Sequence, residues 1–136
     1  MSYKTVIYDF YEIIGVIMNK KAIRIKKVES ILSRKIEQIY QEQLEHQLDS
    51  ISYRLFDSTL IILLEGTITP PEKLLHNSDR VSLAKEVREA IDSVIHPRIQ
   101  HSIEETLEVK VVDFLSDTTI DNNLTGAIAI FEFEAN

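Results

Sequence analysis

Three arginines are the residues best suited by type to bind a ligand. Arg54 lies in a run with strand-like alternation, whereas Arg88 and Arg98 lie ten residues apart in one long helical pattern. A guanidinium presents its N–H donors in one plane and pairs well with carboxylate and phosphate groups. These three side chains therefore form the predicted anion site, and ordinary ion pairs with neighbouring glutamates are the alternative.

The other polar side chains form weaker patterns. His96 and His101 lie five residues apart, but no third ligand stands at a recognised zinc spacing. The oxygen-rich segment around Asp117 and Asp121 lacks the central glycine and distal glutamate of a calcium loop and is typical of turns. The sequence has no cysteine nucleophile, glycine-rich phosphate loop or nucleophile elbow. We therefore expect no enzymatic activity, no metal and no cofactor.

Composition is that of a soluble globular protein. The 136 residues suffice for one domain, and 44% hydrophobic and 27% charged residues are ordinary fractions. The lack of cysteine is compatible with a reducing cytoplasm. No secretory signal is evident, and no stretch reaches the roughly 20 apolar residues that span a bilayer. We expect a cytoplasmic protein without a transmembrane segment.

Charge is distributed unevenly within the net charge of −7. Residues 1–35 hold eight Lys or Arg and three Asp or Glu, whereas residues 36–136 hold seven and nineteen. The acidic body argues against a nucleic-acid partner, because phosphate binding needs a positive surface. We divide the chain into an N-terminal extension, residues 1–27, apolar and then basic, and a domain, residues 28–136.

A tight hairpin is the clearest local prediction. Residues 51–56 alternate between apolar and polar, residues 57–58 are a two-residue polar break, and residues 60–64 are apolar on both faces. A run that is apolar on both faces is typical of a strand in the interior of a sheet. Everything else in the domain is expected to cover or extend this hairpin.

Helical patterns flank the hairpin. Residues 1–19 and 28–48 have helical spacing, and Thr69 and Glu72 match a capping box that starts a short helix over residues 71–76. The pattern over residues 79–107 contains Pro97, which predicts either one bent helix or two helices.

Two further strands complete the expected fold. They are predicted over residues 109–115 and 126–134, joined by a long loop over residues 116–125. The predicted fold class is α+β: a two-layer sandwich with a four-stranded, largely antiparallel sheet of two hairpin-like pairs. The helices lie on one face, in the order α-ββ-αα-ββ.

One longer pattern spans the hairpin, the long helix and the last strands. It consists of Arg54, LIILLEGTIT at residues 60–69, Glu72, Leu74-Leu75, Val87-Arg88, Pro97, Ile103-Glu104, Ser116-Asp117 and Phe131. Over about residues 30–134 it resembles the MpsC-like family of small bacterial proteins, named after a sodium-translocating, membrane-potential-generating system. The family often has a glycine-rich turn where this chain has residues 46–49, and a glycine where it has Leu107-Glu108.

The resemblance implies an accessory protein at a membrane complex for ion or inorganic-carbon uptake, with no catalytic residues to carry over. We therefore expect a non-enzymatic accessory or interaction protein, with a protein partner at a membrane complex. A homodimer or higher homo-oligomer is expected, because one helical layer leaves the second face of such apolar strands uncovered. A small-anion or metabolite sensor that binds through the three arginines is the alternative.

The N-terminal extension combines an apolar stripe with a basic cluster. The stripe of Ile7, Phe10, Ile14 and Ile17 is expected to pack on the sheet or on the same stripe of a second subunit, since such a stripe is rarely left exposed. The alternative is a projecting arm attracted to anionic lipid or nucleic acid. Its basic residues are Lys20, Lys21, Arg24, Lys26 and Lys27.

Overall fold

The protein folds as two layers, one of helices and one of strands. The computed structural model describes the backbone of residues 3–133 and the side chains of residues 12–17, 19–20 and 22–133. The elements are α1 (Tyr3–Leu44), β1 (Ser50–Phe56), β2 (Thr59–Glu65), α2 (Pro70–Asn77), α3 (Val81–Leu107), β3 (Val109–Thr119) and β4 (Leu124–Phe133).

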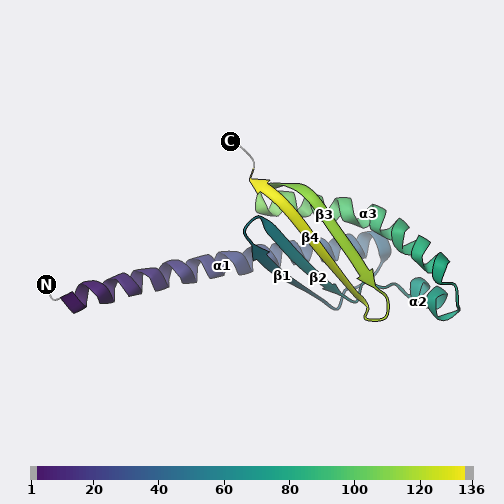
Figure 1. Cartoon of the computed structure of the whole chain (residues 1–136), viewed down its shortest axis with the longest axis horizontal. Helices are drawn as coiled ribbons and strands as arrows, with labels where there is room; N and C mark the ends of the chain where they lie inside the picture. Colours follow the sequence, from purple (N-terminus) through teal and green to yellow (C-terminus); the bar gives the residue numbers. More distant parts are fainter. Residues whose placement is uncertain (1–2, 134–136) are drawn as a thin grey trace.

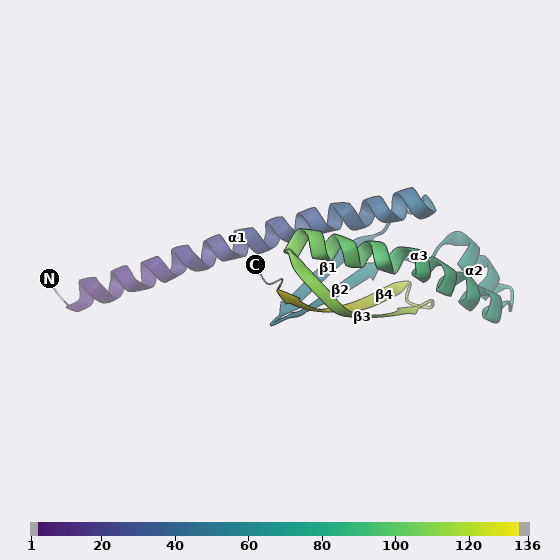
Figure 2. The same ribbon diagram turned by 90° about the horizontal axis from the view of Figure 1, so that it is seen from above.

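The four strands form one antiparallel sheet in the order β1-β2-β4-β3. The second half of α1 and the C-terminal half of α3 cover one face of this sheet, whereas α3 begins beyond the sheet, beside α2 (Figures 1 and 2). The predicted α+β class and the order α-ββ-αα-ββ are confirmed. The hairpin turn lies at Asp57-Ser58 as predicted, and the strand that is apolar on both faces, β2, lies in the interior of the sheet.

The core lies between the helices and the sheet. From α1 it takes Leu32, Ile36 and Tyr40, whose spacing of four places them on one face of the helix. The side chains that meet them include Ile103 of α3 and Ile62 of β2, both fully buried. Fully burying one such aliphatic side chain contributes about 1.5–3 kcal/mol, so this stripe anchors the second half of α1 to the body.

The first half of α1 projects beyond the sheet (Figure 1). We call residues 3–27 the arm; no described side chain from residue 12 to residue 27 is buried, and the helix continues unbroken through Val28. The expectation that this segment packs on its own sheet is therefore wrong, because a continuous helix carries it past the end of the sheet. In the predicted stripe, Ile14 is half-buried and Ile17 is 60% exposed, while the side chains of Ile7 and Phe10 lie outside those described.

The short elements follow their predicted signals with small shifts. α2 begins at Pro70 behind the Thr69–Glu72 capping box, as predicted. α3 is one helix with Pro97 inside it, which decides between the two alternatives. α1 ends at Leu44 rather than near residue 48, because the next residue, Glu45, turns into a left-handed conformation with φ 50°.

The predicted long loop between the last two strands is wrong. β3 continues to Thr119, so only residues 120–123 connect it to β4. The polar residues Ser116, Asp117 and Thr118 pair in register with residues 125–127 of β4. Their polarity indicated a loop, but backbone pairing with a long neighbouring strand keeps them in the sheet.

Two buried tyrosines, Tyr40 and Tyr53, predict a loss of stability at alkaline pH. Burial disfavours the phenolate and raises the pKa of each from 10.0 to about 12. The unfolded chain therefore releases these protons at lower pH than the folded chain. The free energy of unfolding should fall between about pH 10 and 12, by about 1.4 kcal/mol per pH unit for each tyrosine.

The variant Tyr40→Phe isolates one tyrosine's contribution. It should show a shallower fall in the free energy of unfolding over the same alkaline range, measured by urea denaturation, because one proton fewer is linked to unfolding. All other titratable groups are the same in both proteins, so only the difference between the two slopes is used. Equal slopes would contradict the effect of burial at Tyr40.

Candidate functional site

A buried ion pair joins α2 to α3. Arg88 Nε lies 2.6 Å from Glu72 Oε1, Arg88 Nη2 lies 2.7 Å from Glu72 Oε2, and the two side chains are 9% and 0% exposed. Arg88 Nη2 also donates to the backbone oxygen of Thr67 at 3.0 Å, and Nη1 to Asp92 Oδ1 at 3.4 Å. All three nitrogens of this guanidinium are thus engaged within the chain.

Glu72 is also the third helical residue of the capping box of α2, whose N-cap is Thr69. Its Oε2 accepts hydrogen bonds from the backbone N–H and the hydroxyl of Thr69, at 2.8 and 2.7 Å. A buried carboxylate needs a charged partner and further donors to offset its loss of hydration. Glu72 has both, so this cluster holds the start of α2 against α3.

The other two arginines lie elsewhere. Arg54 is exposed on β1, where its Nη1 donates to the backbone oxygen of Tyr53 at 2.7 Å. Arg98 is exposed on α3 and lines a shallow hollow together with His101 and Pro97. Neither Arg54 nor Arg88 lines this hollow. The structure therefore does not bring the three predicted anion-binding side chains together in that hollow.

The two histidines of α3, His96 and His101, contact nearby carboxylates. His96 Nε2 lies 3.5 Å from Asp92 Oδ1; burial lowers the pKa of His96, Asp92 acts to raise it, and Arg88 acts to lower it. His101 pairs with Glu105 one helical turn away. Among the described side chains, no group of three His, Asp or Glu residues is arranged to hold a metal ion.

A cluster of hydroxyls and one glycine ties the loops at one end of the sheet. Thr67 Oγ1 lies 2.8 Å from Thr125 Oγ1, which lies 2.7 Å from Thr118 Oγ1. Asn123 Oδ1 accepts a hydrogen bond from Ile68 N at 2.8 Å, and Gly66, with φ +80°, donates its N–H to Asn123 O. Sequence reasoning missed this cluster, whose only signal is the spacing of threonines over residues 67–69 and 118–125.

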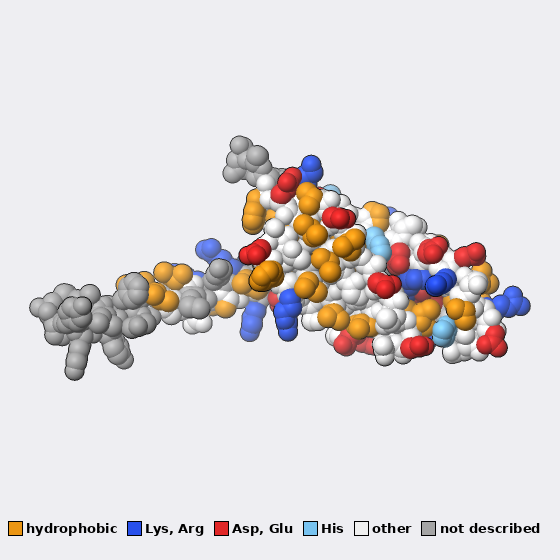
Figure 3. Space-filling view, viewed as in Figure 1, with side chains coloured by type: hydrophobic (Ala, Val, Ile, Leu, Met, Phe, Trp, Pro, Cys, Tyr) orange, Lys and Arg blue, Asp and Glu red, His pale blue; other side chains and the backbone are white. Residues whose placement is uncertain are grey.

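The uncovered face of the sheet carries a row of apolar side chains. The strand register aligns Arg54, Ile61, Ile128 and Leu115 across β1, β2, β4 and β3. The last three are 37%, 38% and 53% exposed. Figure 3 views this side of the molecule and shows hydrophobic side chains across the sheet, with acidic side chains around them.

The neighbouring row on this face contains a glycine, which has no side chain. It aligns Ser52, Leu63, Gly126 and Asp117, and Leu63 is 36% exposed. An antiparallel sheet with one face in water ordinarily alternates to polar residues on that face. β2 and β4 do not, so we call these two rows the open sheet face and treat it as a contact surface.

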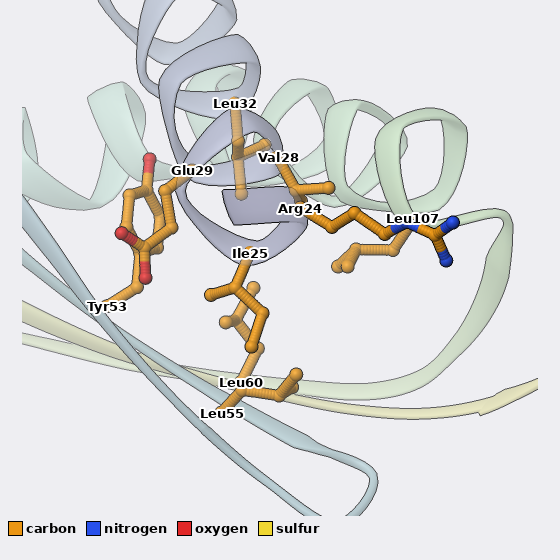
Figure 4. A pocket seen from close by; sticks show the side chains of 9 residues that line it. All are labelled: Arg24, Ile25, Val28, Glu29, Leu32, Tyr53, Leu55, Leu60 and Leu107. Atoms are coloured by element: carbon orange, nitrogen blue, oxygen red, sulfur yellow. The ribbon is translucent and has the colours of Figure 1, made fainter. Parts of the chain in front are cut away.

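An apolar crevice opens where α1 leaves the body (Figure 4). Its lining includes Ile25, Val28, Leu55, Leu60 and Leu107, and its volume is about 140 Å³. Sites for drug-sized metabolites measure about 300–1,000 Å³, so this crevice is too small for such a ligand.

The arm presents a second apolar surface. Four of its side chains are about half exposed or more: Ile13 at 59%, Val16 at 52%, Ile17 at 60% and Ile23 at 65%. In the part of the chain that the structure describes, no helix combines the length and the apolar composition needed to cross a membrane.

Comparison with known proteins gives one match. The model of a family described as "Na+-translocating membrane potential-generating system (MpsC)" matches residues 24–133. The match begins near the end of the arm, so it covers the open sheet face but not the exposed apolar side chains of Ile13, Val16, Ile17 and Ile23. No curated protein and no solved structure matches the chain.

Proposed function

Since this chain belongs to the MpsC family, we propose that it is a non-enzymatic accessory protein of a membrane system for ion or inorganic-carbon uptake. We further propose that it acts as a homo-oligomer. The family name denotes a Na⁺-translocating, membrane potential-generating system, and an accessory protein of such a system works by binding other proteins.

The apolar row on the open sheet face carries this proposal. Ile61, Ile128 and Leu115 form a continuous apolar strip across three adjacent strands. Exposed apolar patches of this kind, bordered by polar residues, are typical of protein–protein contact sites. The ion pair of Arg88 with Glu72 is buried and supports the fold, which favours a binding protein over an enzyme.

Membrane potential in the native host tests the accessory role. Removing the gene should abolish the part of the membrane potential that depends on added Na⁺, measured with a potential-sensitive dye. The intact gene should restore it, whereas the variant Ile128→Glu, altered on the open sheet face, should not. An unchanged potential in the deletion strain would contradict the proposal.

The alternative is a small-anion or metabolite sensor that uses Arg54, Arg88 and Arg98. Arg54 and Arg98 are exposed, but Arg88 would have to exchange its carboxylate partner for the ligand. A bound anion would raise the melting temperature by mass action. A rise with nucleotides, bicarbonate, phosphate or carboxylates would favour the sensor; the accessory proposal expects none.

A further inference from the structure

We propose that the arm of one copy lies across the open sheet face of a second copy, and that a two-fold axis makes the exchange reciprocal. This inference rests on the proposed homo-oligomer and specifies its contact. Each copy then supplies the second cover that the other copy's sheet lacks.

Both surfaces are unpartnered within one chain. The arm extends past the end of the sheet, so it does not cover its own open face (Figure 2). Its Ile13 and Ile17 are 59% and 60% exposed, and the open sheet face exposes Ile61, Leu115 and Ile128. A helix with this much exposed apolar area is normally covered by another layer.

The two surfaces match in size. The arm's 25 residues span about 37 Å at the helical rise of about 1.5 Å per residue. The 11 residues of β3 span about 36 Å at about 3.3 Å per residue. Four strands lie about 14 Å across from first to last, and a helix is about 10 Å wide, so a single arm covers most of the face.

Charge favours the contact of arm with sheet over two alternative contacts, sheet with sheet and arm with arm. The described arm cations are all exposed: Lys20, Arg24, Lys26 and Lys27. The open side of the sheet exposes four acidic and two basic side chains: Glu65, Asp113, Asp117 and Glu132 with Arg54 and Lys110. Face-to-face sheets would bring two acidic surfaces together, and parallel arms would bring two basic clusters together. An arm on a sheet joins opposite charges twice in each dimer.

The glycines support the same contact. Gly66 is required inside the chain, because its φ is +80° and a Cβ there would lie 2.6 Å from Asp49 Cγ. Nothing inside the chain requires glycine at Gly126 in β4 or at Gly15 in the arm, since a Cβ at either would meet nothing within 4 Å. Glycine weakens both strands and helices, and inside a strand it often marks a close approach of another backbone. Gly126 lies in the middle of the open sheet face, where the arm would pass.

The chain has no cysteine, so single cysteines can report the contact without interference. We expect Ile17→Cys mixed with Ile128→Cys to give a covalent dimer of the two variants with a short bis-maleimide. Because each variant has one cysteine, this product joins two copies. The matched control mixes Ile17→Cys with Leu83→Cys, whose position on α3 is 41% exposed, and should give little product.

Each other outcome overturns the inference in a distinct way. Ile17→Cys linking to itself would show that arms pair, and Ile128→Cys linking to itself would show that sheets pair. No product in a protein of dimeric mass would remove the arm placement and leave the proposed homo-oligomer standing. A monomeric mass would remove both, and binding of that monomer to phosphatidylglycerol vesicles would identify the arm as a lipid contact.

The variant Gly126→Val tests the contact a second time, because it should weaken the dimer without destabilising the single chain. Valine favours strand conformation and has open space in one chain, so the melting temperature of the separated chain should not fall. The same methyl groups obstruct the arm, so the dissociation constant of the dimer should rise about tenfold. An unchanged dissociation constant would overturn the arm's path over Gly126.

Discussion

Glu72→Ala should destabilise the fold by about 3–5 kcal/mol, because it leaves the buried guanidinium of Arg88 without its counter-charge. The variant also removes the carboxylate that accepts the backbone N–H of Thr69 at the start of α2. Urea denaturation of variant and parent at neutral pH measures the difference. A shift in free energy of this size lowers the melting temperature of a domain of this length by well over about 5 °C.

Two further variants separate the ion pair from general effects of substitution. Glu86→Ala makes the same change at an exposed position of α3, and its effect should stay within about 0.5 kcal/mol. The double variant Glu72→Leu with Arg88→Met removes both charges, so it should be more stable than Glu72→Ala alone. A loss below about 1 kcal/mol in Glu72→Ala would show that Arg88 is solvated rather than held by Glu72.

Ile128→Glu should dissociate the oligomer, because it places a carboxylate at the centre of the apolar row on the open sheet face. Burying an unpaired charge in a contact is strongly unfavourable. We expect the dissociation constant to rise at least about thirtyfold, which corresponds to the roughly 2 kcal/mol of a central contact residue. Analytical ultracentrifugation over a concentration series measures it.

The matched control for this variant is Leu83→Glu. Leu83 is 41% exposed on α3 and Ile128 is 38% exposed on β4, so the same change is made at similar exposure on different layers. Leu83→Glu should leave the dissociation constant unchanged, and circular dichroism should show that both variants are folded. Equal effects of the two variants would contradict a specific role for the open sheet face.

Local patterns predicted the parts of the fold that depend on neighbouring residues. The Asp57-Ser58 turn, the interior position of β2 and the capping box at Glu72 each follow from a few adjacent side chains. The partner of Arg88 was among the neighbouring glutamates considered, but its burial was not predicted. Burial depends on how α2 packs against α3, which no local pattern encodes.

The arm shows the other limit of sequence reasoning. Its helical spacing correctly indicated a helix, but an unbroken helix through residues 27 and 28 directs the arm away from its own sheet, where packing was expected. The two places where the family often has glycine and this chain does not, residues 46–49 and Leu107-Glu108, lie at or beside positions with left-handed backbone. Glu45, which precedes residues 46–49, and Glu108 have left-handed backbone with φ 50° and 55°, where glycine is favoured.

The mass of the intact chain in solution tests the central claim most directly. If the open sheet face and the arm are contact surfaces between copies, light scattering at neutral pH should give at least twice the 15.7 kDa of one chain. The apolar row of Ile61, Ile128 and Leu115 would then be covered in the assembly. A mass of 15.7 kDa that does not change with concentration would contradict the account.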